Sequence, residues 1–101
     1  MKYIFNWDLL AINSYIQESE FILLKWNDLE VQKFQELVYE NLERLSVNPK
    51  IGIYRNGLKI YSIVISKQTT LYYNFNPLIK IIELHIFWNN SKNPADLARL
   101  L

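Results

Sequence analysis

The chain has 101 residues and a formal net charge of +1; half of its residues are hydrophobic and 15% are aromatic. A chain of this length supports one hydrophobic core, so we expect a single domain over residues 1–101, and its apolar content excludes intrinsic disorder. The absence of cysteine excludes disulfides and thiolate metal sites. Because no apolar run approaches the ~20 residues of a membrane helix and no signal-peptide pattern follows Met1, we expect a cytoplasmic protein with no membrane partner.

Charge is divided unevenly along the chain. Residues 7–46 carry eight acidic and three basic side chains, whereas residues 47–101 carry seven basic and two acidic ones. A positive half favours an anionic partner on that side of the molecule. The same division also arises where helices are rich in Glu and strands carry Lys at their edges, and the sequence leaves both interpretations open.

The first half predicts a strand followed by two helices. Residues 3–5 form the short strand, and Asn6 is the expected N-cap of a first helix whose apolar residues recur at helical spacing. Residues 21–26 are apolar almost all round, which predicts that the end of this helix is buried on both sides. Asn27 caps a second helix with an apolar stripe, and the Asn-Pro pair at 48–49 ends it.

The second half changes to the period of strands. Residues 58–65, 69–75 and 78–88 are strand-like, and the polar turns between them are short enough for antiparallel neighbours. The last segment is apolar on both faces, which predicts a central strand. Asn93 then caps a short helix that begins at Pro94. This order predicts an α+β fold: an N-terminal strand, an α-helical hairpin packed on an antiparallel three-stranded β-meander, and a short C-terminal helix.

Three segments in this order resemble the RelE/ParE family of toxins from type II toxin–antitoxin modules, which are also described as plasmid stabilisation proteins. LERLSVNPKIG (residues 42–52) is similar to the family's helix that runs into an Asn-Pro-x-x-Gly turn. ISKQTTLYYNF (residues 65–75) is similar to its second meander strand, and IIELHIFWNNSKNPADL (residues 81–97) to its last strand and the following loop. The resemblance spans nearly the whole chain and implies a growth-inhibiting toxin that a cognate antitoxin neutralises.

The loop after the last strand departs from the family pattern at one position. Ser91 stands where an arginine is usual, and Lys92 follows it. A guanidinium presents a fixed fork to phosphate or carboxylate, whereas a lysine presents a flexible point charge. The departure argues against any activity that depends on that arginine.

The RelE branch implies a metal-independent endoribonuclease that cuts messenger RNA on the ribosome. Such chemistry needs a base, an acid and a cation for the charge that develops on the phosphorane. If the chain has this activity, the candidate catalytic side chains are His85, Lys59, Lys67, Arg55 and Tyr73, with Tyr61 as a further candidate.

Strict alternation along the strands limits which of these side chains can meet. It places His85 on one face with Phe87, and Trp88 on the other face with Leu84. Tyr72 and Tyr73 project to opposite faces, so only one of them can share a site with a given lysine. A lone histidine in a strand is more often structural than catalytic.

The ParE branch implies a toxin that binds its target, DNA gyrase, without chemistry of its own. The low net charge and the singly spaced lysines favour this branch, because binding among ribosomal phosphates depends on clustered cations. A third hypothesis is a degenerate toxin that only binds its antitoxin. We therefore expect no catalytic residue, no metal and no cofactor, with DNA gyrase as the target and the ribosome and its messenger RNA as the alternative.

A binding toxin needs a contact surface, and the loop after the last strand is the candidate. The expected target or antitoxin contacts are Lys67, Trp88, Asn89, Asn90, Ser91 and Lys92. Trp7, Trp26 and Trp88 are candidate anchors for an antitoxin, and the sequence leaves open which of them are exposed.

Overall fold

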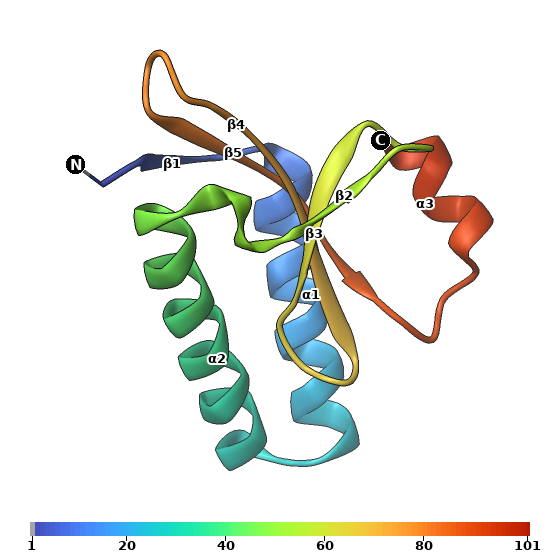
Figure 1. The fold of residues 1–101 in the computed structure, drawn as a ribbon. Coiled ribbons are helices and arrows are strands. Elements are labelled where there is room, and N and C mark those ends of the chain that lie inside the picture. Colours follow the sequence, from blue (N-terminus) through green and yellow to red (C-terminus); the bar gives the residue numbers. More distant parts are fainter. Residues whose placement is uncertain (1) are drawn as a thin grey trace.

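The computed structural model describes residues 2–101, and its elements follow the expected α+β order (Figure 1). The strands are β1 (Ile4–Trp7), β2 (Ile53–Arg55), β3 (Ile60–Val64), β4 (Thr69–Asn76) and β5 (Ile81–Asn89). The helices are α1 (Leu9–Lys25), α2 (Asp28–Val47) and α3 (Pro94–Leu100), with a short 3₁₀ helix η1 (Pro49–Ile51) after α2. Among residues 2–101, no helix combines the length and the apolarity needed to cross a membrane.

The five strands form one mixed sheet in the order β1-β5-β4-β3-β2. β1 runs parallel to β5, and the remaining neighbours are antiparallel. The predicted central position of the last strand is confirmed, because β5 lies between β1 and β4. The meander has four strands, so the prediction of three was wrong. β2 was missed because its three residues are all exposed and give no alternation of apolar and polar positions.

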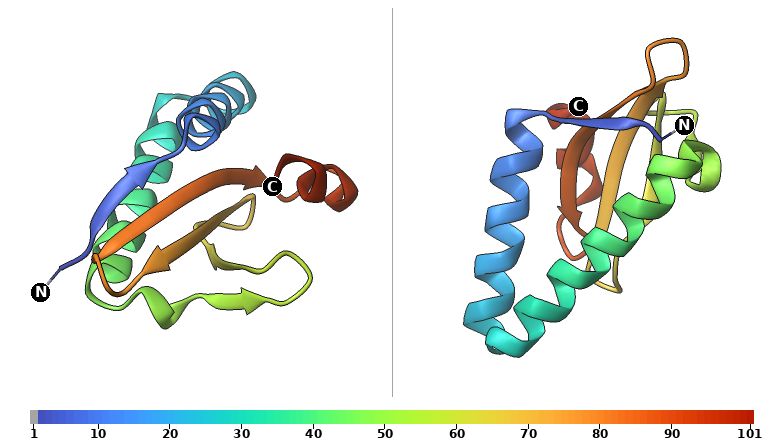
Figure 2. Two further views of the ribbon diagram at one scale, coloured as in Figure 1. Left: turned by 90° about the horizontal axis from the view of Figure 1, so that it is seen from above. Right: turned by 90° about the vertical axis from the view of Figure 1, so that its left-hand side faces the viewer.

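Helices cover both faces of the sheet, as Figure 2 shows: α1 and α2 pack on one face and α3 on the other. The main core lies between the sheet and the α1–α2 hairpin. Within it, Trp7 stacks on Phe87 with ring centroids 5.5 Å apart, and Tyr15 contacts Phe87 and Phe34. A smaller core of Ile86, Trp88 and Leu97 lies beneath α3.

β5 contains a bulge that exchanges the faces of its second half. Its pairing with β4 passes from Leu84 to Ile86 and skips His85. Leu84 and Phe87 therefore both pack in the main core, whereas Ile86 and Trp88 both pack beneath α3. The expected grouping of His85 with Phe87, and of Trp88 with Leu84, was wrong because the extra residue breaks the period of two. The prediction for β4 is confirmed, since Tyr73 lies in the main core and Tyr72 packs against the residues beneath α3.

The start of α1 and its last turns also differ from the expectation. Asp8, not Asn6, is the N-cap, because β1 continues through Trp7 in register with β5. Only Ile22 is buried among residues 21–26, and Leu24 is 88% exposed. A helix that packs on a sheet buries one stripe, so the apolar residues on its outer side stay in water.

The other helix boundaries agree with the sequence. The Asn27 side chain accepts a hydrogen bond from the Glu30 N–H at 3.0 Å, which caps α2. Asn48 is the C-cap of the same helix. The Asn93 side chain accepts from the Ala95 N–H at 3.1 Å and so caps α3.

One tyrosine ties the turn after α2 to the middle of the sheet. Tyr73 is fully buried. Its hydroxyl donates to the Pro49 carbonyl oxygen at 2.6 Å and accepts from the Gly52 N–H at 3.1 Å. Burial raises the pKa of Tyr73 to about 12. The hydroxyl is therefore neutral and fully engaged with the backbone.

Gly52→Ala should destabilise the fold, whereas Gly57→Ala should not. A Cβ at Gly52 would overlap the Tyr73 hydroxyl and lie 2.7 Å from the Ser62 carbonyl oxygen, but a Cβ at Gly57 meets nothing within 4 Å. We expect Gly52→Ala to cost about 1–3 kcal/mol, as overpacking of a buried site does. Urea unfolding of both variants measures the difference. Equal midpoints would contradict the close packing of Gly52 against Tyr73.

Stability should fall as the pH rises from about 10 to about 12. An unfolded tyrosine releases its proton near the ordinary pKa of 10.0, whereas folded Tyr73 keeps its proton to about 12. In this window the native state binds more protons than the unfolded state, so the free energy of unfolding decreases with pH. In Tyr73→Phe, the free energy of unfolding measured in urea should decrease less steeply with pH. A residual slope remains from Tyr15, because burial raises the pKa of Tyr15 as well. An unchanged slope in Tyr73→Phe would contradict this assignment.

Candidate functional site

A buried carboxylate anchors the polar loop that follows β5. Glu18 lies on the face of α1 that packs against the sheet and is 4% exposed. One of its oxygens accepts from the Thr69 hydroxyl at 2.5 Å, and the other accepts from the Asn89 side-chain amide at 3.0 Å. Both oxygens need these donors, because an unpaired buried charge is strongly destabilising. The carboxylate therefore joins α1, β4 and β5 at one point.

Asn89 also folds the loop that follows it. Its side-chain oxygen accepts from the Ser91 N–H at 2.9 Å and from the Ser91 hydroxyl at 2.6 Å. Its main-chain oxygen accepts from the Lys92 N–H at 3.1 Å. Asn90 links the loop to the turn between β3 and β4, because its amide donates to the Lys67 carbonyl oxygen at 3.1 Å. The loop is thus held in one conformation by side-chain hydrogen bonds.

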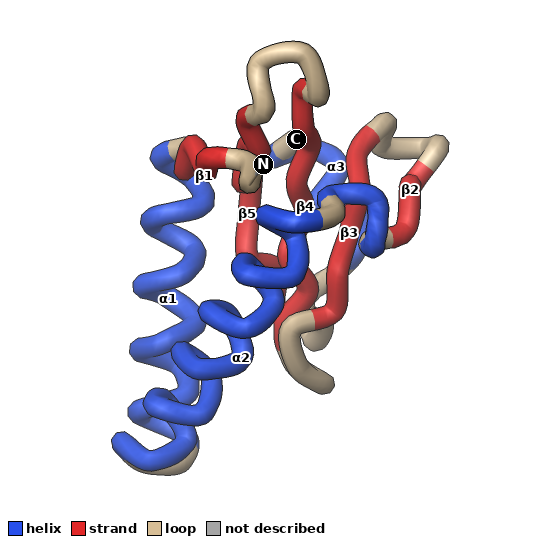
Figure 3. Tube along the Cα trace, turned by 60° about the vertical axis from the view of Figure 1, so that its left-hand side comes forward, coloured by secondary structure: helices blue, strands red, loops and turns tan. Residues whose placement is uncertain are grey.

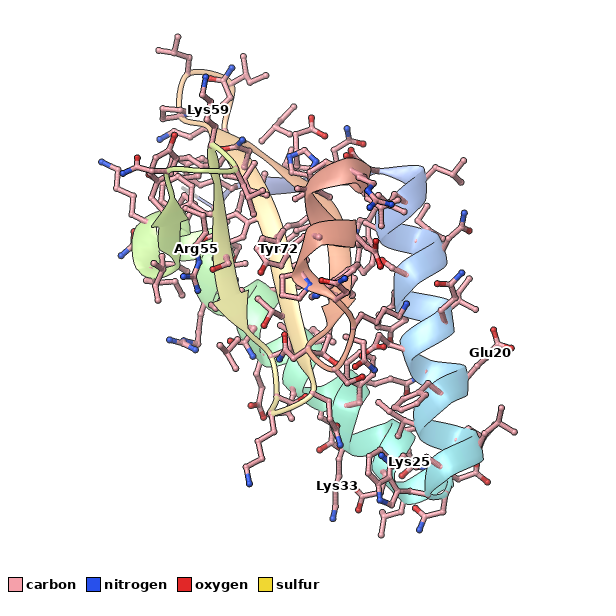
Figure 4. All side chains as sticks on the ribbon, turned by 90° about the vertical axis from the view of Figure 1, so that its right-hand side faces the viewer. Glu20, Lys25, Lys33, Arg55, Lys59 and Tyr72 are labelled. Carbon is pink, nitrogen blue, oxygen red and sulfur yellow. The ribbon has the colours of Figure 1, made fainter. Side chains whose placement is uncertain are left out.

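A surface pocket of about 260 Å³, here called the loop pocket, lies beside this loop. Its walls come from α1, the β3–β4 turn and the loop itself: Phe21, Lys25, Lys67, Gln68, Asn89, Asn90 and Ser91. The sequence suggested singly spaced lysines, but the fold brings Lys25 and Lys67 to the same pocket. Figure 4 shows Lys25 and Lys33 at the end of the molecule where α1 meets α2. Two cations, an aromatic ring and several amides therefore face one hollow, an arrangement that suits an acidic group on a partner.

The structure brings most of the predicted contact residues together. Lys67, Asn89, Asn90 and Ser91 line the loop pocket, and Lys92 continues the loop. Trp88 does not reach the surface: it is 5% exposed beneath α3, with the Lys92 ammonium 5.7 Å from the centre of its ring.

The three tryptophans, whose exposure the sequence left open, lie in different environments. Trp7 packs in the main core and Trp88 beneath α3. Trp26 is 42% exposed and therefore has the most accessible ring of the three.

The candidates for ribonuclease chemistry occupy separate parts of the sheet. His85 Nδ1 lies 2.7 Å from Asp8 Oδ2, at a pocket of about 290 Å³ between β5, the β2–β3 turn and the end of α3. Lys67 contacts Asn90, which follows His85 by five residues. At about 3.3 Å per residue in a strand, this places the main chain of Lys67 roughly 16 Å from that of His85 along β5 and its loop.

Of the remaining candidates, only Lys59 lies close to either group. Arg55 Nε donates to the buried Ser62 hydroxyl at 2.9 Å, on the face of the sheet that carries α3. Tyr73 and Tyr61 stack in the main core, with ring centroids 5.7 Å apart. Lys59 lies in the β2–β3 turn, at the end of the sheet opposite Lys25 and Lys33 (Figure 4). Lys59 thus lies between Leu58 and Ile60, which line the His85 pocket, and Lys67 lies in the β3–β4 turn at the far end of β3.

Sequence reasoning missed four residues that shape these sites: Glu18, Asp8, Lys25 and Phe21. Glu18 left a signal, because it follows Ala11 and Ser14 at helical spacing and precedes Ile22 on the buried stripe. A carboxylate in an apolar stripe predicts buried donors for it. The partner of Asp8, His85, is distant in sequence and left no such signal. Lys25 lies over the rings of Phe21 and Trp26, four residues before it and one after it, but the pocket that it lines is completed by residues distant in sequence.

The fold is that of RelE-like toxins, as predicted. The chain is similar to a mutant of the E. coli toxin RelE in the free state, in which two arginines are replaced by alanine; the TM-score is 0.64 and the identity 16%, over 98% of this chain and 92% of that one. It is also similar to the toxin–antitoxin complex RelBE2 from Mycobacterium tuberculosis, with a TM-score of 0.59 and 13% identity over 89% of this chain and 100% of that one. No family model matches the sequence, and no curated protein matches it. At these identities the similarity shows the fold.

Glu18→Gln should destabilise the protein, whereas Glu20→Gln should have little effect. An amide at position 18 turns one acceptor into a donor, so either the Thr69 hydroxyl loses the acceptor for its proton or the Asn89 amide faces another donor, at a cost of about 1–3 kcal/mol. Glu20 is exposed on the same helix, and Figure 4 shows its side chain projecting into solvent. Urea unfolding measures both variants. If the two substitutions had equal effects, the buried hydrogen bonds of Glu18 would not be stabilising.

Proposed function

We propose that this chain is the toxin of a type II toxin–antitoxin module, that it acts in the cytoplasm, and that a cognate antitoxin neutralises it. The fold it shares with the toxin RelE and with the complex RelBE2 supports this class of function. We further propose that it acts by binding its target, in the manner of the ParE branch, with DNA gyrase as the target.

We favour binding over catalysis because the candidate ribonuclease side chains lie apart from one another. A general base, an acid and a cation act together only when all of them reach the same few atoms of the substrate. Here the main chains of His85 and Lys67 lie roughly 16 Å apart along β5 and its loop, Tyr73 is buried with its hydroxyl bound to the backbone, and Arg55 is held by Ser62. By contrast, four of the six predicted contact residues (Lys67, Asn89, Asn90 and Ser91) line the loop pocket.

The loop pocket indicates what kind of surface the toxin binds. Lys25 and Lys67 supply positive charge, Phe21 supplies an apolar contact, and Asn90 and Ser91 are exposed amide and hydroxyl groups. A partner that fills it would present an acidic side chain next to an apolar one. Because the loop is already ordered by Asn89, binding costs little conformational entropy.

The pair formed by His85 and Asp8 supports a second candidate function, a RelE-like ribonuclease. A carboxylate 2.7 Å from an imidazole nitrogen orients the ring, which is what a general base requires. The pair borders a pocket that is also lined by Leu58 and Ile60, the chain neighbours of Lys59. The two hypotheses place the working surface at the middle of β5 and at the loop that follows it, so they can be separated by substitution.

Induced expression followed by pulse-labelling should show DNA synthesis falling before protein synthesis. Lys25→Glu combined with Lys67→Glu should relieve growth inhibition by at least about tenfold, because both charges that face the target change sign. Lys50→Glu is the matched control: it makes the same change at an exposed lysine in η1, beyond the C-terminal end of α2, and should leave toxicity intact. His85→Gln should also leave it intact. Thermal unfolding confirms that each variant folds.

Three results would contradict the proposal. If protein synthesis fails first and messenger RNA is cut, and if His85→Gln reduces toxicity by orders of magnitude, the chain is a ribonuclease. If neither synthesis stops, the chain is a degenerate toxin that only binds its antitoxin, and Ser91→Arg would be the substitution to restore the usual arginine. If Lys50→Glu acts as strongly as the double variant, the loop pocket is not the contact surface.

A further inference from the structure

A second pocket, here called the hairpin pocket, opens where the α1–α2 hairpin meets the β3–β4 turn. Its volume is about 310 Å³, and its apolar lining consists of Ile22, Trp26, Phe34 and Leu37. Ile22 and Phe34 are buried and form the floor, whereas Trp26 and Leu37 are exposed and form the walls. Figure 3 shows α1 and α2 converging at this end of the molecule, where the β3–β4 turn also lies. The hollow is large enough for one aromatic or large aliphatic side chain.

The two pockets differ in charge. The charged residues that line the hairpin pocket are Glu30 and Lys33, whose side chains pair with each other at 3.3 Å. Among residues 2–101, the loop pocket is lined by Lys25 and Lys67 and by no acidic side chain. The carboxylate of Glu18 is buried, with both oxygens already hydrogen-bonded. An acidic group is therefore attracted to the loop pocket, while the hairpin pocket favours an uncharged apolar group.

The hairpin pocket and the loop pocket are neighbours that share a wall. Gln68 lines both of them. On the α1 side, the Lys25 ammonium lies 5.5 Å from the centre of the Phe21 ring in the loop pocket and 4.9 Å from that of the Trp26 ring in the hairpin pocket. The two rings meet edge to face. Lys25 is therefore placed to bind an acidic group while Trp26 contacts an apolar group beside it.

We propose that the two pockets form one docking surface for a segment of the target that carries an acidic residue and a large apolar residue side by side. The acidic residue binds Lys25 and Lys67 in the loop pocket, and the apolar residue fills the hairpin pocket. This inference rests on the proposed function, in which the loop pocket contacts the target. Because Lys25 and Gln68 stand between the pockets, a partner that fills one of them also covers the other, and one partner accounts for both.

The distances set the spacing of the two residues in the target segment. A hydrogen bond between an ammonium and a carboxylate is about 2.8 Å long, so a carboxylate on Lys25 lies within about 8 Å of the centre of the Trp26 ring. Alternate residues of an extended strand are about 7 Å apart, and one helical turn spans about 5.4 Å. The acidic residue therefore stands two positions from the apolar one if the segment is extended, and three or four positions if it is helical.

A small probe with the same two groups tests the shared surface on the unaltered chain. 4-Phenylbutyrate joins a carboxylate to a ring, whereas butyrate lacks the ring and 4-phenylbutanol lacks the charge. In NMR titrations, 4-phenylbutyrate should shift both the Trp26 indole N–H and the Ser91 backbone N–H, with a dissociation constant of about millimolar for a ligand of this size. Butyrate and 4-phenylbutanol should each bind at least about fivefold more weakly, because each loses one of the two contacts. Equal affinities of the three probes, or shifts in one pocket only, would overturn the proposal.

A substitution in the hairpin pocket separates the two contacts. Leu37→Gln should raise the dissociation constant of 4-phenylbutyrate at least about fivefold and leave that of butyrate unchanged, because it places an amide in the apolar wall. Leu29→Gln is the matched control: Leu29 is exposed on the same helix and lines neither pocket, so both constants should stay the same. Thermal unfolding confirms that both variants fold. An equal effect of the two substitutions on 4-phenylbutyrate would contradict the assignment of the hairpin pocket.

Growth inhibition distinguishes this inference from the proposed function. If both hold, Leu37→Gln relieves the inhibition caused by induced expression, and Leu29→Gln does not. If Lys25→Glu combined with Lys67→Glu leaves toxicity intact, the proposed function fails and this inference fails with it. If that double variant relieves toxicity and Leu37→Gln does not, the loop pocket contacts the target but the hairpin pocket serves another partner, such as the antitoxin, and only this inference is overturned.

Discussion

The buried carboxylate of Glu18 is the constraint on which the candidate site depends. It sits between α1 and the sheet, and its two oxygens take the Thr69 hydroxyl and the Asn89 amide. Since a buried charge is tolerated only while it is hydrogen-bonded, the three elements must keep this relative position. Asn89 uses its remaining acceptor to hold Ser91, so the order of the helix–sheet interface extends into the surface loop. The loop is therefore held in place by hydrogen bonds that continue from the core beneath it.

A second buried polar group, the Tyr73 hydroxyl, fixes the other end of the helical hairpin. Tyr73 holds η1 through Pro49 and Gly52, and so fixes where the chain leaves α2 and enters β2. Between these two anchors the interface is mostly apolar: Trp7 stacks on Phe87, Tyr15 meets the Phe87 ring edge-on, and the Ser14 hydroxyl accepts from the Phe87 N–H at 2.9 Å. Apolar packing alone tolerates small sliding of helices over a sheet, whereas directional hydrogen bonds at two separated points do not. The position of the loop relative to Lys25 depends on both.

The features predicted correctly are those whose cause lies within a few residues. Asn27 and Asn93 are N-caps because each side chain reaches a backbone N–H two or three residues ahead. The features that were missed depend on partners distant in the chain. The bulge at His85 arises from pairing between two strands, and its effect on Phe87 and Trp88 cannot be seen in either strand alone. Likewise, Lys25 and Lys67 line one pocket only because the end of α1 lies beside the β3–β4 turn and the loop after β5, so lysines that are singly spaced in the sequence give two cations in one pocket.

α1 contributes both to the core and to the loop pocket. One side of the helix holds Glu18 and the core contacts, its C-terminal end brings Lys25 and Phe21 to the loop pocket, and its outer side exposes Leu9, Ile16 and Leu23. The buried stripe of the helix holds Glu18 as well as the apolar contacts. Because Phe21 and Lys25 follow Glu18 within two turns of the same helix, the hydrogen bonds of Glu18 also set where these two side chains stand against the loop.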